Sequence, residues 1–255
     1  MERFGAPILR NGGEVMQGKN NFKRILSGIM SVAMAATLLP SLPAVAEDAA
    51  EKYPYTMFAA SDTEGAITIN ANNFCVNGNI ATNGTIVSSG NMNVNGTKTE
   101  NADEEMIYIL KKLNYSYFSG DNVETYADDY SFEDLNININ NPMDVNGTLE
   151  LTGNINLNSG IKAVEDVTIN GEVKNTNNSV ICSETGDINI ETSNVNFSGL
   201  IYAPYGDINI DTDNLNLNNV IIIGQTITID CPSINANYSN SMAELVGTES
   251  DIEVE

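Results

Sequence analysis

The sequence of 255 residues contains no histidine and no tryptophan, and its three arginines all lie before residue 47. Without histidine, the chain lacks the side chain that most often acts as a general base near neutral pH, activates a nucleophile or binds zinc. Without arginine after residue 46, it also lacks the bidentate clamp that holds carboxylate or phosphate groups. These absences argue against most enzymatic functions, and we predict neither catalytic nor metal-ligating residues.

Positive charge is scarce throughout the chain. After Ala46 there are six lysines and 34 − 2 = 32 acidic residues, which gives a net charge of 6 − 32 = −26. Such a surface repels nucleic acids and anionic membranes and attracts cations. We therefore expect no nucleic-acid partner, no anionic membrane partner and no cofactor beyond adventitious calcium.

Cysteine is also rare, with Cys75, Cys182 and Cys231 as the whole set. The odd number leaves at least one thiol unpaired, and the spacings match neither a zinc site nor a redox pair. Each cysteine lies in a strand-like run, so we expect all three to pack as small apolar side chains. A single disulfide is the open alternative for an exported protein.

The amino-terminal region has the three parts of a secretory signal peptide. Cations over residues 19–24 precede an apolar run over 25–39, and the small residues of Ala44-Val45-Ala46 follow. We predict cleavage after Ala46, because an apolar run of 15 residues is short for a transmembrane helix. Residues 1–15 do not fit this leader, so we place the true start of translation at Met16.

Two consecutive segments, 186–204 and 206–224, have nearly the same sequence. Both open with Gly-Asp-Ile-Asn-Ile, and apolar residues of a third segment align with them at spacings of 20 and 19 residues. A repeat this short cannot bury its own apolar side chains, so it has to stack on its neighbours. The predicted columns are Ile188, Ile208 and Ile227; Ile190, Ile210 and Ile229; Val195, Leu215 and Ile234; and Phe197, Leu217 and Ala236.

Apolar and polar residues alternate, with glycine and asparagine at the bends, which indicates strands and turns. We predict an all-β fold, a right-handed parallel β-helix with rungs of about 19–20 residues. The outward positions are mostly asparagine and threonine. Stacked pairs such as Asn189 over Asn209 and Asn194 over Asn214 are predicted to form amide ladders along the coil.

The exported chain divides into three predicted parts. Residues 47–64 are expected to cap the first turn, and residues 65–240 to form the β-helix. Residues 98–134 break the alternation and are expected to leave the coil and return to it, with a helix over Asp103–Leu113. Residues 241–255 form an acidic segment whose end alternates like a new strand, so we expect a further module after residue 255; the alternative is a ragged tail.

The predicted insertion is rich in aromatic residues, whose rings can stack on the apolar faces of sugars. The alternative is that these rings pack the inserted helix onto the scaffold. The candidate ligand contacts are Tyr115, Tyr117, Phe118, Tyr126, Tyr130 and Phe132.

Two other site motifs are incomplete. Asp207–Asp213 imitates the first half of an EF-hand loop, but Thr212 occupies the required glycine position and Asn218 the glutamate position, so we expect a strand there. An ice-binding face would need regular Thr-x-Thr rows, and only Thr226 and Thr228 provide one.

Three strings in the last rungs resemble a known group of proteins. Residues 196–210, which read Asn-Phe-Ser-Gly-Leu-Ile-Tyr-Ala-Pro-Tyr-Gly-Asp-Ile-Asn-Ile, are one, and residues 215–224 and 226–229 are the others. They are similar to the Asn-rich parallel β-helix at the amino terminus of large secreted multidomain proteins of clostridia-like anaerobic bacteria. This resemblance implies an exported β-helix followed by further extracellular domains, and it brings no catalytic residues. The likeness to the pectate-lyase-like superfold is one of architecture only.

We therefore expect a secreted, non-enzymatic β-helix that serves as a structural spacer or an adhesive stalk at the bacterial cell exterior, associated with the cell surface. The expected partner is an extracellular glycan or a cell-surface protein. The alternatives are a carbohydrate-binding module that uses the aromatic residues and a polysaccharide-active β-helix enzyme.

Overall fold

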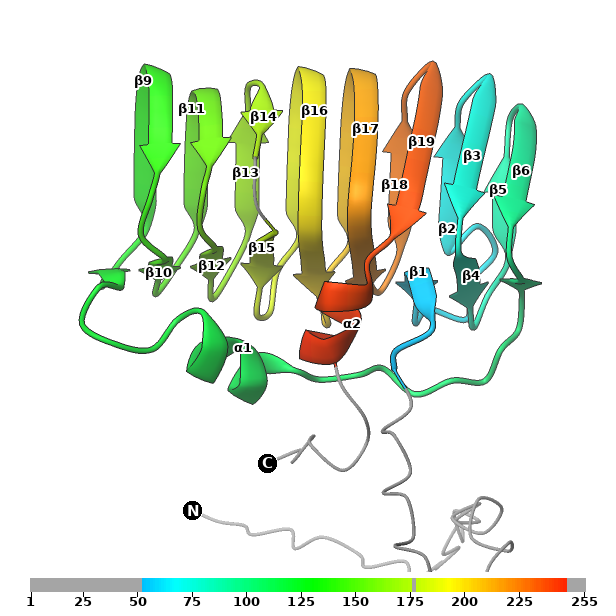
Figure 1. The fold of residues 1–255 in the computed structure, drawn as a ribbon, viewed down its shortest axis with the longest axis horizontal. Helices are drawn as coiled ribbons and strands as arrows, with labels where there is room; N and C mark the ends of the chain where they lie inside the picture. The colour runs from blue at the N-terminus through cyan, green and yellow to red at the C-terminus, as the bar shows by residue number, and fades with distance from the viewer. Residues whose placement is uncertain (1–51, 176–177, 247–255) are drawn as a thin grey trace, which may run out of the picture. The chain divides into compact units, whose positions relative to one another are not determined.

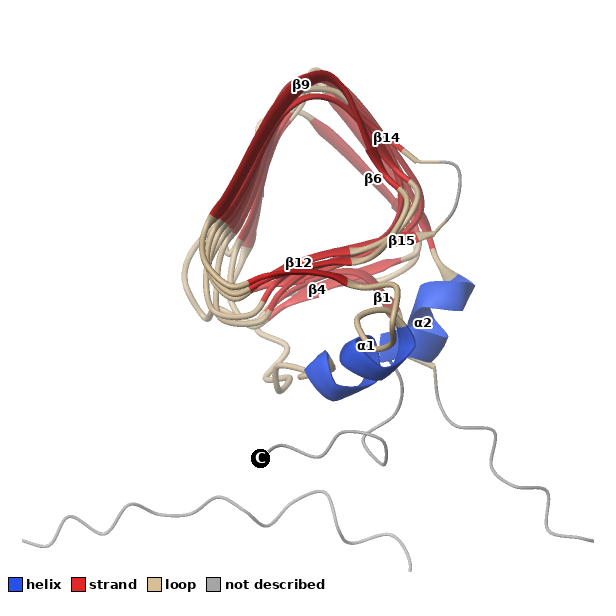
Figure 2. Ribbon diagram, turned by 90° about the vertical axis from the view of Figure 1, so that its left-hand side faces the viewer, coloured by secondary structure: helices blue, strands red, loops and turns tan. Residues whose placement is uncertain are grey.

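The computed structural model describes residues 52–175 and 178–246, which form a parallel β-helix (Figure 1). The strands of the coil form a triangle in cross-section (Figure 2). The predicted β-helical fold is confirmed. The leader predicted for residues 1–46 and the end of the chain after residue 246 lie outside the described residues. Within the described part, no helix is long and apolar enough to cross a membrane.

The three sides of the triangle, named faces A, B and C, follow one another along the chain. Face A contains β2 (Ile67–Asn70), β5 (Ile86–Ser88), β13 (Val167–Asn170) and β18 (Ile227–Asp230). Face B contains β3 (Asn73–Asn77), β6 (Asn91–Asn95), β14 (Val173–Lys174) and β19 (Ser233–Tyr238). Face C contains β1 (Tyr55–Ala59), β4 (Asn79–Thr82), β7 (Lys98–Thr99), β8 (Glu124–Tyr126), β10 (Met143–Val145), β12 (Ile161–Ala163) and β15 (Ser179–Ser183). Longer strands turn corners: β9 (Tyr130–Ile139) and β11 (Leu149–Leu157) run through faces A and B, and β16 (Ile188–Ala203) and β17 (Ile208–Gly224) through all three.

The predicted apolar columns are confirmed. Ile208 pairs with Ile188 on one side and with Ile227 on the other, and all three side chains are fully buried. The other three predicted columns pair in the same way. Removing one isoleucine side chain from water contributes about 1.5–3 kcal/mol, so the stacked columns supply the main driving force for the coil.

The rungs do not stack in the order of the sequence. β18 and β19 are the last strands along the chain, yet they pair with β2 and β3, which places Ile227 beside Ile67 and Ile234 beside Phe74. Face C of this rung is supplied by β1, which pairs with β17 on one side and β4 on the other. One composite rung, made of β18, β19 and β1, therefore joins the two ends of the described chain.

The cap expected over residues 47–64 is not found in residues 52–64, and residues 47–51 lie outside the described residues. β1 is an interior strand, because both of its surfaces are buried: Met57 packs in the main core and Phe58 in a second apolar cluster outside face C. The open ends of the coil lie instead at the rung of β5, β6 and β7 and at the rung of β8 and β9.

Residues 98–134, predicted to leave the coil and return to it, do so only in their middle part, and they return at the opposite end of the coil. Lys98–Thr99 is β7, and the residues from 124 onward already belong to β8 and β9. The connector, residues 100–123, runs along face C from one end of the coil to the other (Figure 1). The strands on face C follow the order β7, β4, β1, β17, β16, β15, β12, β10, β8, so the connector crosses eight strand spacings, or about 38 Å.

The helix predicted over Asp103–Leu113 is wrong for most of that range. Helix α1 comprises Leu110–Ser116, and residues 103–109 are not helical. The hydroxyl of Tyr202 accepts a hydrogen bond from the Ile109 amide (3.0 Å) and donates one to the Ile107 carbonyl (2.9 Å). These backbone groups are therefore held by the scaffold instead of by a helical turn.

Residues 241–246, predicted as part of an acidic segment, belong to helix α2 (Asn240–Val246). The Ser239 hydroxyl accepts a hydrogen bond from the Met242 amide at 3.2 Å, which satisfies one free amide at the start of the helix. Met242 and Val246 are buried against the outer side of face C. Both helices lie on this face (Figure 2), which is consequently buried on its inner and its outer side.

Candidate functional site

The six aromatic residues predicted as one ligand platform are divided between two places. Tyr115, Tyr117 and Phe118 lie in or directly after α1, whereas Tyr126, Tyr130 and Phe132 lie on β8 and β9. The connector carries the first group along face C, and the second group belongs to the end rung of the coil. The platform is therefore not one site, and the two groups are described separately.

The aromatic residues of α1 mainly pack the helix onto the scaffold. Phe118 is buried in the apolar cluster outside face C, and Tyr117 packs against the same cluster. Tyr115 points the other way, with 85% of its surface exposed. For Tyr117 and Phe118 the packing alternative is therefore confirmed.

The aromatic residues of β8 and β9 gather at one open end of the coil. Tyr130 lies beside Leu149 and Phe132 beside Leu151, so both extend columns of the main core to its last rung. The ring centroids of Tyr126 and Tyr130 are 3.8 Å apart, and those of Tyr130 and Phe132 are 6.4 Å apart with an interplanar angle of 16°. Burial, followed by the neighbouring Tyr130 hydroxyl, raises the pKa of Tyr126 to about 12. We call these three residues the end cluster.

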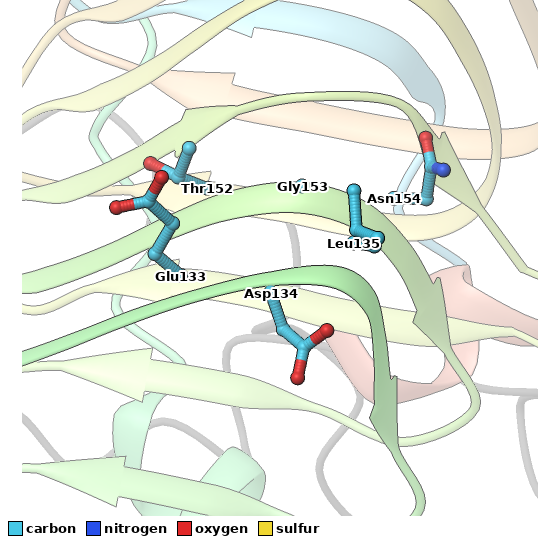
Figure 3. A pocket seen from close by; sticks show the side chains of 6 residues that line it. All are labelled: Glu133, Asp134, Leu135, Thr152, Gly153 and Asn154. Atoms are coloured by element: carbon cyan, nitrogen blue, oxygen red, sulfur yellow. The ribbon is translucent and has the colours of Figure 1, made fainter.

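A shallow depression lies next to the end cluster, at the corner between faces A and B. Figure 3 shows its lining residues, with the side chains of Glu133 and Thr152 close together on neighbouring strands. Leu135, which strict alternation with Ile137 and Ile139 would place inside, is 81% exposed in this lining. The run Glu133-Asp134-Leu135 breaks the alternation at the corner, and this break is the sequence signal that could have located Leu135 outside.

Face B presents a ladder of asparagine amides to solvent. The amide nitrogen of each member donates to the carbonyl oxygen of the next, at distances between 2.6 and 3.3 Å. The order along the ladder is Asn95, Asn77, Asn237, Asn218, Asn216 and Asn196. Amide ladders of the predicted kind are therefore present, and this one crosses the junction between the two ends of the described chain.

The two asparagine pairs named from the sequence differ in their contacts. Asn209 donates from its side-chain nitrogen to the Asn189 carbonyl oxygen at 3.0 Å, as predicted. Asn214 lies beside Asn194 in the register, but its side-chain nitrogen donates to the backbone carbonyl of Ser193 at 3.4 Å. Asn189 and Asn209 therefore form one step of a ladder, while the Asn214 side chain stabilises a corner of the coil.

Face A carries a mixed row of outward residues on its central strands. Thr168, Asn189, Asn209, Thr228 and Thr68 follow one another across five strands. A second row, closer to the corner with face B, contains Asn170, Glu191, Asp211 and Asp230. Asparagine thus interrupts the threonine row, and carboxylates flank it.

The strand interpretation of Asp207–Asp213 is confirmed, since Ile208 and Ile210 are inward residues of β17. Among the described residues, no group of three or more cysteine, aspartate or glutamate side chains is placed to hold a metal ion. We assign no metal site to this surface.

An ion cluster on the outer side of face C was not recognised from the sequence. The Lys162 ammonium group contacts Glu184 Oε1 at 2.9 Å, Asp144 Oδ1 at 3.2 Å and Asn114 Oδ1 at 3.0 Å, and it lies 5.7 Å from the centre of the Phe118 ring. Only 7% of the lysine side chain is exposed. Because Asn114 and Phe118 come from the connector region, the cluster fastens α1 to the coil. No short motif marks it, since Asp144, Glu184 and the pair of Asn114 and Phe118 lie on three separate segments.

The three cysteines are free thiols. Cys182 and Cys231 are buried as expected, and burial raises the pKa of both thiols, which makes them unreactive near neutral pH. Cys75 differs from the prediction, because it lies in the outward row of face B between Asn235 and Asn93. Its position one residue after the inward Phe74 sets this orientation.

Comparison with known proteins gives weak similarity to two solved structures. No protein-family model matches the sequence, and no curated protein matches it. Among solved structures, an ice-binding protein from an Antarctic bacterium of the Flavobacteriaceae is similar at 16% identity and a TM-score of 0.38, over 72% of this chain and 46% of that chain. An ice-binding protein from an Antarctic biological consortium is similar at 13% identity and a TM-score of 0.33, over 79% of this chain and 95% of that chain. The chain thus spans less than half of the length of the first neighbour.

Proposed function

We propose that this protein is a secreted, non-enzymatic β-helix that acts as an adhesive module at the bacterial cell exterior. The proposal rests on the positions of the two ends of the described chain. Lys52 Nζ and Glu244 Oε1 form an ion pair at 2.8 Å, and the Tyr238 hydroxyl donates to the Tyr53 carbonyl oxygen. Both ends therefore leave the coil together, beside the composite rung.

This geometry favours an adhesive role over a spacer role. A spacer holds its two neighbours in the chain apart, so the polypeptide has to enter at one end and leave at the other. Here the two ends of the described chain lie together beside β1, and strands of the coil extend on both sides of it. On face C, β4 and β7 lie on one side of β1, and β17, β16, β15, β12, β10 and β8 lie on the other. Faces A and B and both ends of the coil are left accessible for contact.

The non-enzymatic part of the proposal rests on the residue types of the exported chain. With no histidine and no arginine after residue 46, an acid–base or nucleophilic mechanism would depend on carboxylates and six lysines. Secretion rests on the signal-peptide pattern of residues 19–46. Ice binding is not proposed, because asparagines interrupt the threonine row of face A and carboxylates flank it.

Adhesion of coated particles tests the proposal directly. Beads carrying the purified exported chain are expected to attach to bacterial cell walls or host-cell surfaces, while beads carrying heat-denatured protein are not. The same preparation, incubated with pectins and host glycans, should release no new reducing ends and no unsaturated products. Absence of attachment to every surface, or appearance of such products, would overturn the proposal.

A further inference from the structure

The two open ends of the coil are closed by different kinds of side chain. At the end formed by β5, β6 and β7, the last residues of the core columns are Ile86, Met92 and Val94. At the end formed by β8 and β9, Tyr126 and Tyr130 pack against the core, and Phe132 lies beside Leu151 in the register. Aliphatic residues thus suffice to close the core at one end of the coil. Closure of the core alone therefore does not explain the aromatic rings at the other end.

The end cluster offers ring surface to solvent. Phe132 is 38% exposed, whereas Leu151, its neighbour in the same column, is fully buried. The rings of Tyr130 and Phe132 are nearly parallel and adjacent, since they project from alternate residues of one strand. Two adjacent rings at the end of the coil, one of them 38% exposed, give an apolar surface that suits the C–H faces of sugar rings, and we call this surface the platform.

The rim of the platform is acidic. Glu124, Asp128, Asp129, Glu133 and Asp134 are all exposed on the same rung. The sequence from 124 to 139 contains no lysine and no arginine. A rim of this charge repels uronic acids and sialic acids and attracts ammonium groups. In the adjoining depression, Thr152 and Asn154 add a hydroxyl and an amide that can bond to sugar hydroxyls.

We propose that the end of the coil formed by β8 and β9 binds a glycan that contains positively charged amino sugars. Tyr130 and Phe132 stack on the sugar rings, and the carboxylates of Glu133 and Asp134 pair with the ammonium groups. This inference rests on the adhesive function proposed above and assigns it a surface and a ligand class.

The test measures binding of defined oligosaccharides to the full exported chain by isothermal titration calorimetry. Glucosamine hexamers are expected to bind, N-acetylglucosamine hexamers to bind about tenfold more weakly, and galacturonate hexamers not to bind. Binding of the glucosamine hexamer should weaken as salt increases, because screening reduces the attraction of exposed charges.

Variants separate ring stacking from closure of the core. The double change Tyr130→Leu and Phe132→Leu keeps an apolar side chain at each position, so we expect the circular dichroism spectrum to be retained and glucosamine binding to fall about tenfold or more. Glu133→Gln with Asp134→Asn should remove the preference for glucosamine over N-acetylglucosamine. Tyr115→Leu, which removes an 85% exposed aromatic residue outside the end cluster, is the matched control and should change nothing.

Several outcomes would overturn the inference. They are equal binding by the Tyr130→Leu, Phe132→Leu variant, a preference for galacturonate, no binding of any hexamer, or end-to-end association of the protein that the same variant abolishes. If coated beads still attach to cells while the variant behaves like the unchanged protein, the adhesive function stands and only the assigned surface is wrong. If beads do not attach at all, the proposed function fails as well.

Discussion

At the scale of single residues, Lys162 shows how strongly one buried charge depends on its partners. Its two carboxylate partners are themselves partly buried, with 27% of the Asp144 side chain and 22% of the Glu184 side chain exposed. Replacing Lys162 with methionine leaves both carboxylates without their shared cation. We expect the free energy of unfolding to fall by about 3 kcal/mol, measured by urea denaturation.

The matched control is Lys174→Met, because Lys174 forms an exposed ion pair with Glu172 and should cost less than about 1 kcal/mol. The stabilisation that Lys162 provides also depends on pH. Burial alone lowers the pKa of Lys162, but Glu184 and Asp144 outweigh it and hold the pKa above the ordinary value of 10.5. The stabilisation by Lys162 is therefore complete below pH 10.5 and is lost only as the pH rises through the higher value of the folded state. Equal costs for both variants at neutral pH would contradict this account.

Gly199 illustrates a second constraint at the residue scale, the close approach of successive rungs. Its φ is +141°, and a Cβ atom there would lie 1.9 Å from the Ser179 carbonyl oxygen. Gly120 also has a positive φ, of +116°, but a Cβ atom there would meet nothing within 4 Å. Gly120→Ala should therefore cost only the backbone strain of about 1–2 kcal/mol, whereas Gly199→Ala should cost clearly more or prevent folding. Thermal unfolding of the two variants checks this, and equal melting temperatures would refute it.

At the scale of elements, one tyrosine holds residues 107–109 of the connector to the coil through hydrogen bonds to their backbone. Tyr202 is buried, and its hydroxyl serves both the Ile109 amide and the Ile107 carbonyl. Tyr202→Phe removes that hydroxyl and leaves both backbone groups without a partner, at a cost of about 1–3 kcal/mol. Hydrogen exchange should accelerate over residues 103–116 and stay unchanged in β17. Uniform acceleration over the whole body would show that the tyrosine supports the core and not the connector.

The same element shows where prediction from sequence succeeds and fails. Inward columns such as Ile188, Ile208 and Ile227 are predictable because neighbouring repeats carry nearly identical strings. The helix over Asp103–Leu113 is locally plausible, with acids first and lysines last, but the hydroxyl that displaces it belongs to Tyr202, about ninety positions away in the chain. Local pattern therefore defines the strands, while distant side chains decide the conformation of the segment that covers them.

For the candidate site, too, the sequence predicts the residue types but not their arrangement in space. The aromatic residues could be identified by type, but whether they lie together depends on the path of the connector. Tyr117 and Phe118 pack against face C, and Tyr130 and Phe132 reach the end of the coil because their strand has a partner on one side only among the described residues. The sequence places these four within 16 residues, and the fold separates them by carrying the connector along the coil.

At the scale of the whole molecule, the order of rungs is the feature that the sequence does not reveal. Every rung offers the same strand spacing of about 4.8 Å and similar inward isoleucine, valine and leucine side chains, so almost any rung can stack on any other. What selects the composite rung is the strand that completes it. β18 and β19 fill faces A and B but not face C, and β1 fills the vacant position between β17 and β4.

Engineered disulfides can test this order, in a background in which Cys75 is replaced by serine. Asn77 and Asn237 are neighbours in the register of β3 and β19, and Asn77 Nδ2 donates to Asn237 Oδ1 at 2.6 Å. Adjacent strands place Cα atoms about 5 Å apart, within the range that a disulfide spans. The double change Asn77→Cys, Asn237→Cys should therefore give a cross-link on mild oxidation. Because the bond closes a loop over 160 positions, it should add up to about 5 kcal/mol of stability.

The control pair is Asn93→Cys with Asn138→Cys. Stacking in the order of the sequence would place these residues side by side on β6 and β9, whereas the structure separates them by the strands β3, β19, β17, β16, β14 and β11, which is about 34 Å. No intramolecular cross-link should form in this variant. Mass spectrometry of digested, oxidised protein distinguishes the two cases, and a bond between positions 93 and 138 without one between 77 and 237 would show that the chain coils in sequence order. The reverse result would establish that the two ends of the described chain close one rung together, which is the arrangement that leaves the end cluster on β8 and β9 uncovered.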